Sequence, residues 1–284
     1  MTAPLTEFAP AKINLALHVL GRRADGFHEI NSIVAFADVA DELRFKPAAE
    51  FAITASGTFA GFLPKPQNNI VFAAWKAVAE IARARGLHLP PVSVHLTKNL
   101  PVAAGIGGGS ADAAAALRGF LRLAGIEGID EEIAKAALTL GADVPACLSG
   151  KACRMQGAGE RITPLENFAP LAAVLVNPLI AIQTSDVFQK LGLARGEKRG
   201  TPPTDLSDAT NWRNDLTSSA LALVPAIANV IAALENQPHL RFARMSGSGA
   251  TCFGVFENAE TASAAARKLS ASYPQWWVRQ ATLS

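Results

Sequence analysis

The N-terminal part of the chain alternates apolar and polar side chains with a period of two. Between residues 13 and 19 every second side chain is large and apolar, which is typical of a strand that buries one face. Lys12 and Asn14 lie on the same face of this predicted strand. Further short strands, expected to pair antiparallel, are predicted at residues 27–37, 41–45 and 51–54.

Three later segments carry apolar residues at the spacing of an α-helix. The stripe over residues 70–81 predicts a helix that ends near Gly86, and an alanine-rich run predicts another helix at 113–123. A third helix is expected over residues 130–140, where Gly141 is a natural C′ residue.

The C-terminal part of the chain shows strand and helix patterns in a familiar order. Strands are predicted at 171–176, 241–245, 252–256 and 276–280, and helices at 184–191, 221–234 and 259–270. Strand, helix, strand, strand, helix and strand is the split βαβ order of a ferredoxin-like domain. Residues 193–204, rich in Gly, Pro, Lys and Arg, are expected to form a mobile loop.

The length allows one large domain or two ordinary ones, and the strand and helix patterns indicate the α+β class. The pattern changes near Gly157, so we predict domains at residues 1–157 and 158–284. Half of the 284 residues are hydrophobic and 18% are charged, which allows a sizeable core. The formal net charge of +2 argues against a nucleic-acid-binding surface as the main function.

The cysteines and the N-terminus indicate a cytoplasmic protein. Cys147, Cys153 and Cys252 show neither a C-x-x-C spacing nor histidine partners at zinc-site spacing, so buried reduced cysteines are expected. Residues 1–10 lack the basic and apolar segments of a secretory signal, and no uncharged apolar run is long enough to cross a bilayer.

The densest glycine cluster, at residues 105–109, lies between a predicted strand at 92–96 and the alanine-rich helix. Glycine lets the backbone take positive φ and approach a ligand, and the first amides of a helix lack intrahelical partners. This combination is typical of a phosphate-binding loop. A surface turn without a ligand is the alternative. Two better-known phosphate loops do not match, because one requires a lysine and the other a glycine in place of Ser110.

Two glycine motifs resemble those of the GHMP superfamily of small-molecule kinases. Residues 101–114 are similar to the loop P-x-x-x-G-[IL]-G-[GS]-[GS]-S-A, and residues 246–253, Ser-Gly-Ser-Gly-Ala-Thr-Cys-Phe, are similar to the C-terminal glycine motif. The resemblance covers nearly the whole chain. It implies a ribosomal-protein-S5-domain-2-like N-terminal half that binds ATP and a ferredoxin-like C-terminal half that contributes to substrate binding.

Within that superfamily the chain resembles the branch that phosphorylates a cytidine diphosphate-linked polyol in the non-mevalonate route to isoprenoids. The segments that carry this resemblance are residues 9–15, 23–29, 98–101, 141–145 and 214–216. One departure is Phe27, where this branch usually has tyrosine. A phenyl ring still stacks on a base, but the hydroxyl is lost.

The resemblance implies transfer of the ATP γ-phosphoryl group to a tertiary hydroxyl, with Lys12 and Asp143 as the catalytic pair. Asp143 would take the hydroxyl proton, and Lys12 would keep Asp143 ionised, because a nearby cation favours the carboxylate. From the residues alone, a surface lysine at a strand end and a turn residue after a helix remain the alternatives for these two positions.

The resemblance also implies the binding residues. For ATP these are Asn68, Lys98, Pro101, Val102, Ala103, Ala104, Gly105, Ile106, Gly107, Gly108, Gly109, Ser110 and Ala111. For the second substrate they are Asn14, Phe27, His28, Thr184 and Phe188, with the aromatic rings stacking on cytosine. For Phe188, a place in the core is nearly as good an interpretation.

Mg²⁺ is expected with ATP, although the sequence assigns no ligand residue for it. Small-molecule substrates, no nucleic acid or membrane partner, and a monomer or weak homodimer are expected. Two alternatives remain open: another GHMP kinase, acting on homoserine or a sugar, and a non-catalytic nucleic-acid-binding protein. Residues 26–29 and Phe188 argue against the first, and the charge balance argues against the second.

Overall fold

Two long paired strands open the chain in the computed structural model, which describes residues 5–201 and 212–284. β1 spans Leu5–Arg22 and contains the first predicted strand, whereas β2 spans His28–Pro47 and joins two strands that were predicted separately. The exposed Asp38 lies between these two predictions. Its carboxylate accepts a hydrogen bond from the amide of Thr282 at 2.8 Å, so this polar residue stays within the sheet and does not end the strand.

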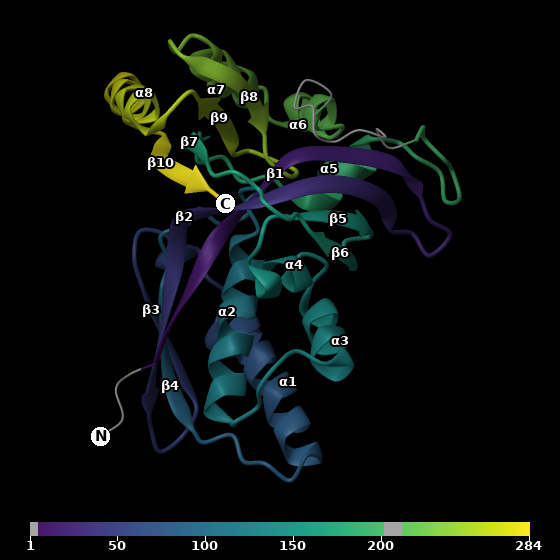
Figure 1. Cartoon of the computed structure of the whole chain (residues 1–284), viewed down its shortest axis with the longest axis vertical. Coiled ribbons are helices and arrows are strands. Elements are labelled where there is room, and N and C mark those ends of the chain that lie inside the picture. Colours follow the sequence, from purple (N-terminus) through teal and green to yellow (C-terminus); the bar gives the residue numbers. More distant parts are fainter. Residues whose placement is uncertain (1–4, 202–211) are drawn as a thin grey trace. The chain divides into compact units, whose positions relative to one another are not determined.

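The described residues form two compact units, and each unit is discontinuous in sequence (Figure 1). Unit 1 contains residues 5–11, 40–102 and 107–150, and unit 2 contains residues 12–39, 103–106 and the described residues from 151 onwards. β1 and β2 therefore each contribute residues to both units. A single cut near Gly157 does not describe this division, and the domain boundary at residues 157 and 158 stays a prediction.

Unit 1 contains a mixed sheet. β4, Val92–Thr97, pairs antiparallel with β2 from Glu42 opposite Thr97, and β3, Ala52–Ser56, pairs parallel with β4. The expectation of antiparallel pairing throughout this part was therefore wrong for β3. The reason is that a helix lies between β3 and β4 in the chain, and a crossover of this kind brings two strands together in parallel.

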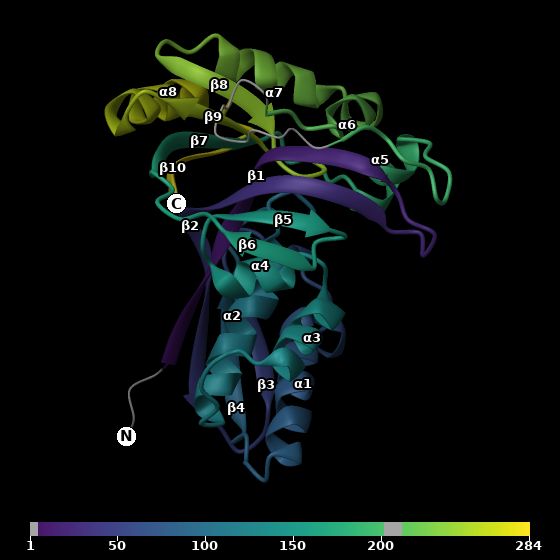
Figure 2. The same cartoon turned by 45° about the vertical axis from the view of Figure 1, so that its right-hand side comes forward.

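The helices of unit 1 include all three that were predicted. They are η1 (Ala60–Phe62), η2 (Pro66–Asn68), α1 (Ile70–Ala84), α2 (Gly108–Leu123), α3 (Glu131–Leu140) and α4 (Val144–Ser149). The α1 and α2 helices pack against each other and lie side by side in both views (Figures 1 and 2). α3 ends at Gly141 as predicted, but Gly141 is extended and not left-handed. α4 was not predicted.

Unit 2 contains an antiparallel sheet in the order β10–β7–β9–β8. These strands are β7 (Leu171–Asn177), β8 (Leu240–Met245), β9 (Cys252–Phe256) and β10 (Trp277–Leu283). Their order along the chain and across the sheet is that of a ferredoxin-like domain, as predicted. The hairpin of β5 (Cys153–Gly157) and β6 (Arg161–Pro164) pairs with β2 and was not predicted, because its glycines read as a domain boundary.

The helices of unit 2 are α5 (Thr184–Lys190), α6 (Thr217–Leu223), α7 (Ala226–Glu235) and α8 (Ala259–Ser272). The single helix predicted at 221–234 is wrong, since α6 ends before Val224 and α7 begins after Pro225. Proline lacks the amide hydrogen that would continue the helix. α8 begins with a capping box, in which Asn258 and Thr261 exchange hydrogen bonds.

The loop predicted at 193–204 is described as far as residue 201. The amide of Gly196 donates to the carbonyl of Arg22 at 2.8 Å, and the amide of Arg199 donates to the carbonyl of Leu20 at 2.6 Å. This part of the loop is therefore attached to β1. Residues 202–204 lie outside the described residues.

Candidate functional site

The glycine loop passes through both units. Pro101 and Val102 end one stretch of unit 1, residues 103–106 belong to unit 2, and the chain returns to unit 1 at Gly107. α2 begins at the next residue, and Gly107 is its N-cap with a left-handed φ of 62°. The first hydrogen bond into this helix runs from the amide of Ala111 to the carbonyl of Gly107 at 2.8 Å.

The amides of Gly108, Gly109 and Ser110 therefore open a helix that has no side-chain cap. A Cβ at Gly109 would meet nothing within 4 Å, so open space surrounds this part of the turn. Unpartnered amides at a helix N-terminus, together with the helix dipole, attract an anion. The start of α2 has the geometry that binding of a phosphate group needs.

Gly105 packs against the second glycine motif. The hydroxyl of Ser246 donates to the carbonyl of Gly105 at 3.0 Å, and the amide of Thr251 donates to the carbonyl of Ala104 at 3.1 Å. A Cβ at Gly105 would lie 2.5 Å from the carbonyl oxygen of Ser246. Here the lack of a side chain lets two stretches of backbone approach each other, which is a structural use of glycine.

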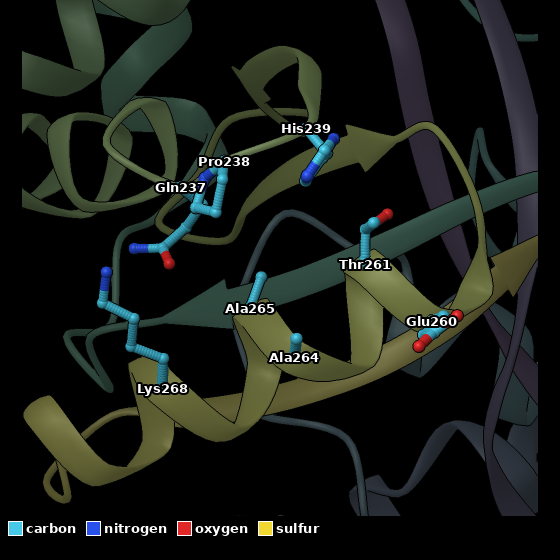
Figure 3. Close-up of a pocket in the computed structure, with 8 residues that line it drawn as sticks. All are labelled: Gln237, Pro238, His239, Glu260, Thr261, Ala264, Ala265 and Lys268. Atoms are coloured by element: carbon cyan, nitrogen blue, oxygen red, sulfur yellow. The ribbon is translucent and has the colours of Figure 1, made fainter.

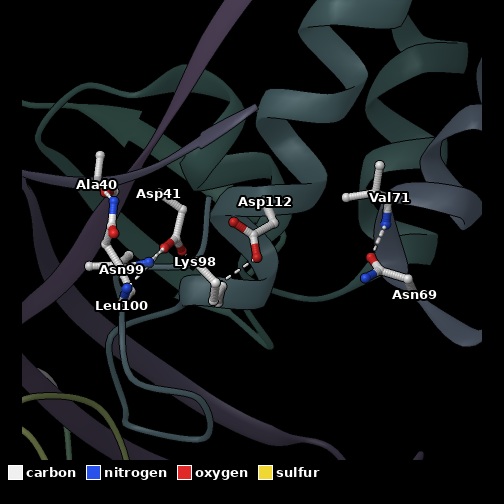
Figure 4. Close-up of polar contacts among 8 residues, drawn as sticks. All are labelled: Ala40, Asp41, Asn69, Val71, Lys98, Asn99, Leu100 and Asp112. Atoms are coloured by element: carbon white, nitrogen blue, oxygen red, sulfur yellow. Dashed lines mark hydrogen bonds and ion pairs between the residues drawn. The ribbon is translucent and has the colours of Figure 1, made fainter. Parts of the chain in front are cut away.

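Three buried charged side chains meet at the start of α2, and one of them belongs to this helix (Figure 4). Lys98 Nζ donates to Asp41 Oδ2 at 2.6 Å and to Asp112 Oδ2 at 2.5 Å, and all three side chains are at most 3% exposed. The other oxygen of Asp41 accepts the amides of Asn99 at 2.5 Å and Leu100 at 2.8 Å. We call Asp41, Lys98 and Asp112 the buried triad.

The buried triad has two carboxylates for one ammonium group. Among the described residues, Oδ1 of Asp112 has no hydrogen-bond partner. Burial raises the pKa of Asp112 to about 7, and the nearby Asp41 charge raises it as well, against the opposing effect of Lys98. The pKa of Lys98 is also raised, because the attraction of both carboxylates outweighs the effect of its burial.

Lys12 and Asn14 form a buried polar group in unit 2. Lys12 Nζ donates to Asn14 Oδ1 at 3.0 Å, and Asn14 Nδ2 donates to the hydroxyl of Ser32 at 2.7 Å. The backbone amide of Lys12 donates to the carbonyl of Ile106 in the glycine loop at 2.9 Å. Lys12 is 3% exposed and lies inside β1, so the alternative of a surface lysine at a strand end is wrong.

Asp143 lies in unit 1 at the N-cap position of α4, and it is half-buried. Its carbonyl accepts the amide of Cys147 at 3.1 Å, while its side chain does not cap the helix. The turn that carries it lies beside the start of α2, because a Cβ at Gly141 would lie 3.8 Å from the hydroxyl of Ser110. In unit 1 the candidate base is therefore close in structure to the candidate phosphate site.

The predicted cytosine-binding residues lie in unit 2. The rings of His28 and Phe188 are in contact, with centroids 4.6 Å apart and an interplanar angle of 30°. Phe27 precedes β2 and is 61% exposed, which leaves its ring available for stacking. Among the described residues, Nε2 of His28 is buried without a hydrogen-bond partner, and burial together with the charge of Arg22 lowers the His28 pKa.

Two further predicted residues are on the surface. Thr184 begins α5, and its hydroxyl shares a hydrogen bond of 2.9 Å with the hydroxyl of Ser248 in the second glycine motif. Asn68 is exposed at the end of η2. The next residue, Asn69, is buried and caps α1 by accepting the amide of Val71 at 2.9 Å (Figure 4).

Two family models match the chain. The model described as "GHMP kinases N terminal domain" covers residues 69–151, and the model described as "GHMP kinases C terminal" covers residues 205–275. A protein of Roseobacter denitrificans named 4-diphosphocytidyl-2-C-methyl-D-erythritol kinase is 46% identical, with 97% of this chain and 92% of that protein covered. A protein of Paramagnetospirillum magneticum with the same name is 43% identical, with 97% of each covered.

The chain belongs to the GHMP kinases, and within them to the 4-diphosphocytidyl-2-C-methyl-D-erythritol kinases. A crystal structure of 4-(cytidine 5'-diphospho)-2C-methyl-D-erythritol kinase has 31% identity, covers 99% of both chains and has a TM-score of 0.78. The structure of homoserine kinase from Cytophaga hutchinsonii has a TM-score of 0.68 at 18% identity, with 99% of this chain and 96% of that chain covered. That second likeness shows the shared GHMP fold alone.

Asn214 and Asp215 lie in a segment that carries the resemblance, but the sequence assigned them no role. Asn214 Nδ2 donates to the carbonyls of Met245 and Gly247, both at 2.8 Å, and the carboxylate of Asp215 accepts the amide of Val19 at 2.9 Å. Asp41 was missed. The only signal for Asp41 in the sequence is an aspartate within an apolar strand pattern, and this signal does not indicate that Lys98 is its partner.

Unit 2 contains a cavity of about 280 Å³, and none of the residues predicted for catalysis or binding is among those that line it (Figure 3). It lies between the turn that precedes β8 and the helix α8, and its lining includes Gln237, His239, Thr261 and Lys268. None of its lining residues belongs to a GHMP kinase motif.

Within the described ranges, no group of three or more His, Cys, Asp or Glu side chains is arranged to hold a metal ion. The same ranges contain no helix that is long and apolar enough to span a bilayer. Cys147, Cys153 and Cys252 are all buried, as predicted.

Proposed function

We propose that this kinase transfers the γ-phosphoryl group of ATP to the 2-hydroxyl of 4-diphosphocytidyl-2-C-methyl-D-erythritol, in the non-mevalonate route to isoprenoids. The observation that carries this proposal is that relatives with this name match at 43–46% identity over at least 97% of the chain. We also propose that this small-molecule kinase acts in the cytoplasm and that it is a monomer or a weak homodimer.

The glycine loop and the start of α2 would hold the ATP phosphates. Their support is geometric, since the amides of Gly108, Gly109 and Ser110 open the helix beside free space. The other loop residues, from Pro101 to Ile106 and Ala111, would shape this turn, and the exposed Asn68 would contact adenine. Lys98 is included as a residue near the nucleotide, although its ammonium group is held by two carboxylates.

In the proposed mechanism the oxygen of the substrate's 2-hydroxyl attacks the γ-phosphorus of ATP, and Asp143 accepts the proton of that hydroxyl. The bond from that phosphorus to the β–γ bridging oxygen breaks, and ADP leaves. Lys12 supplies positive charge that favours the ionised form of Asp143 and stabilises the phosphoryl group in transfer. Burial of Lys12 strengthens this electrostatic effect, because charges act over a longer range where water is excluded.

Mg²⁺ is part of the proposal as a companion of ATP. The described residues offer no dedicated cage of carboxylate and imidazole ligands for it. Mg²⁺ in kinases is held largely by the nucleotide phosphates and by water, with one or two carboxylates, so a cage is not needed. When bound, it would neutralise phosphate charge, and no residue of this chain is assigned to it.

The cytidine end of the substrate would bind at Phe27, His28 and Phe188. Cytosine would stack on the exposed Phe27 ring, and the ring or backbone of His28 would hydrogen-bond the edge of the base. Asn14 and Thr184 would contact the polyol and its phosphates. Asn14 also holds Lys12, so it would act next to the catalytic cation.

The test is a direct assay of the purified protein with ATP, Mg²⁺ and the cytidyl substrate. We expect ADP and one new phosphate monoester on the polyol, detected by ³¹P NMR. Homoserine, galactose and the unmodified polyol serve as alternative acceptors under the same conditions. Turnover of one of these, with no turnover of the cytidyl substrate, would contradict the proposed substrate and support another GHMP kinase activity.

A further inference from the structure

We propose that Asp41 and Asp112 are positioning residues, which hold both ends of the glycine loop through Lys98. The proposal rests on the proposed function, because it takes this loop as the binding site of the ATP phosphates. Neither carboxylate is among the residues predicted to touch a substrate. All three members of the buried triad lie in unit 1, as do the two points at which the chain leaves this unit and returns to it.

The upstream end of the loop is held by Asp41. Its Oδ1 accepts the amides of Asn99 and Leu100, the last two residues before Pro101. Its Oδ2 accepts Lys98 Nζ, so one fully buried carboxylate binds three consecutive residues of the chain. Hydrogen bonds from backbone amides to an ionised carboxylate are short and strong, and they fix the direction in which the chain leaves β4.

The downstream end is held by Asp112 in α2. Its Oδ2 accepts the same ammonium group, so Lys98 links the strand that precedes the loop to the helix that follows it. A Cβ at Gly108 would lie 3.4 Å from Lys98 Nζ, which places the first turn of α2 directly against this group. The direction of the α2 N-terminus, whose amides would meet the phosphates, is therefore set by the triad.

The charge balance of the triad supports a positioning role over a role in stability alone. Two buried carboxylates around one lysine repel each other, and an oxygen of Asp112 lacks a hydrogen-bond partner among the described residues. A buried ion pair often contributes no more to stability than apolar residues of the same volume, and in some proteins it is such a group that fixes one geometry. An apolar contact would be the better choice if stability were the only requirement.

The experiment compares Asp112→Asn, Asp41→Asn and Asp41→Leu with the wild-type kinase. Steady-state kinetics give kcat and the KM values for ATP and for the cytidyl substrate. For Asp112→Asn we expect kcat/KM for ATP to fall roughly 10- to 100-fold, since small displacements of phosphate-binding groups have effects of this size. The KM for the cytidyl substrate should stay within about twofold of the wild-type value, because its proposed aromatic residues lie elsewhere in the chain.

The two Asp41 variants form a matched pair. Asparagine keeps an oxygen for the amides of Asn99 and Leu100, whereas leucine of similar size keeps none. We expect a higher KM for ATP in Asp41→Leu than in Asp41→Asn, and faster hydrogen exchange of these two amides. Val78→Ala is the control, because it opens a cavity in α1 of the same unit without changing the triad. General destabilisation lowers the active fraction and leaves both KM values unchanged.

The outcomes separate this inference from the proposed function. Wild-type protein without activity on the cytidyl substrate would contradict the proposed function itself. An active wild type, with KM for ATP unchanged in both Asp112→Asn and Asp41→Leu, would overturn the positioning role alone. If Asp112→Asn is recovered unfolded, the two Asp41 variants test the positioning role instead. Equal KM values for ATP in wild type, Asp41→Asn and Asp41→Leu would then overturn that role.

Discussion

Lys12 and Asp143 have to act together if the proposed mechanism holds. Asp143→Asn keeps the size of the side chain and removes the base, so we expect kcat to fall about 10²- to 10⁴-fold with both substrates still bound. Lys12→Met should also reduce kcat strongly. Since each residue depends on the other, the double variant should lose much less than the product of the two single losses.

The measurement is steady-state kinetics on the purified single and double variants, with circular dichroism to confirm folding. Asn14→Asp is a further variant for comparison with Lys12→Met, because it keeps the acceptor of Lys12 Nζ and adds a negative charge beside this ammonium group. A nearly normal kcat in Asp143→Asn would remove this residue from the mechanism. The enzyme would then work by positioning and by stabilisation of the phosphate charge, as other phosphoryl transferases do.

The buried Asp112 predicts a specific pH dependence of stability. Its pKa is about 7 in the folded protein because of burial, above the ordinary value of 3.8. Between pH 3.8 and about 7 the folded protein keeps a proton that the unfolded chain has released, so this contribution to the free energy of unfolding falls as the pH rises across that range and is lost once the pH exceeds about 7. Asp112→Asn lacks this titrating group. Between pH 5 and pH 8 its free energy of unfolding should therefore fall by about 1–3 kcal/mol less than that of the wild type.

Urea unfolding at pH 5 and pH 8 measures this difference. The control Val78→Ala should be less stable than wild type by a similar amount at both pH values, because it changes no titrating group. Parallel pH profiles for wild type and Asp112→Asn would show that Asp112 titrates at the same pH in the folded and unfolded states.

At the scale of elements, most helices and strands could be predicted because the apolar spacing is regular. The stripe that predicts α1 ends three residues early, and β7 is predicted almost to its last residue. The errors have identifiable causes. Pro225 breaks an apolar stripe that reads as one helix, and the hairpin of β5 and β6 consists of short strands joined through glycine.

The glycine loop shows what sequence can and cannot say about a site. The cluster at residues 105–109 predicts a close backbone approach, but the partner of each glycine depends on tertiary structure. Gly105 faces the carbonyl of Ser246, whereas Gly109 faces open space. Asp41 is 57 residues from Lys98 in sequence, and no local pattern connects them.

Gly105 and Gly109 therefore make a matched pair of alanine variants. Gly105→Ala should lower the free energy of unfolding by about 1–3 kcal/mol, because its φ is +73° and the new Cβ would lie 2.5 Å from backbone oxygen. Gly109→Ala should keep or slightly raise stability, since alanine favours helix. It should nevertheless weaken ATP binding if the phosphates approach this residue.

Thermal unfolding and calorimetric titration with a non-hydrolysable ATP analogue measure the two effects separately. The expected result is a crossed pattern, in which one variant loses stability and the other loses nucleotide affinity. Equal affinity of Gly109→Ala and wild type for the analogue would move the phosphate site away from the start of α2.

At the scale of the whole molecule, the interleaved units predict how the chain can be divided. A fragment of residues 158–284 contains the four strands of the ferredoxin-like sheet but lacks residues 12–39 and 103–106 of the same unit. It would lose the hydrogen bonds that Asn14 and Leu17 make with Ser246 and Arg213, together with a buried stretch of β1. Apolar side chains that β1 covers would then be exposed to water.

We therefore expect this fragment to unfold at a lower urea concentration than the full chain and with less cooperativity. Binding of a hydrophobic dye and a proton NMR spectrum of the purified fragment report the exposed apolar surface and the loss of fixed packing. Adding a separate peptide of residues 5–47 should restore part of the stability, because it supplies both long strands. A fragment that unfolds cooperatively at the full-chain midpoint would instead support an autonomous domain that begins near residue 158, and β1 would then be dispensable for the C-terminal sheet.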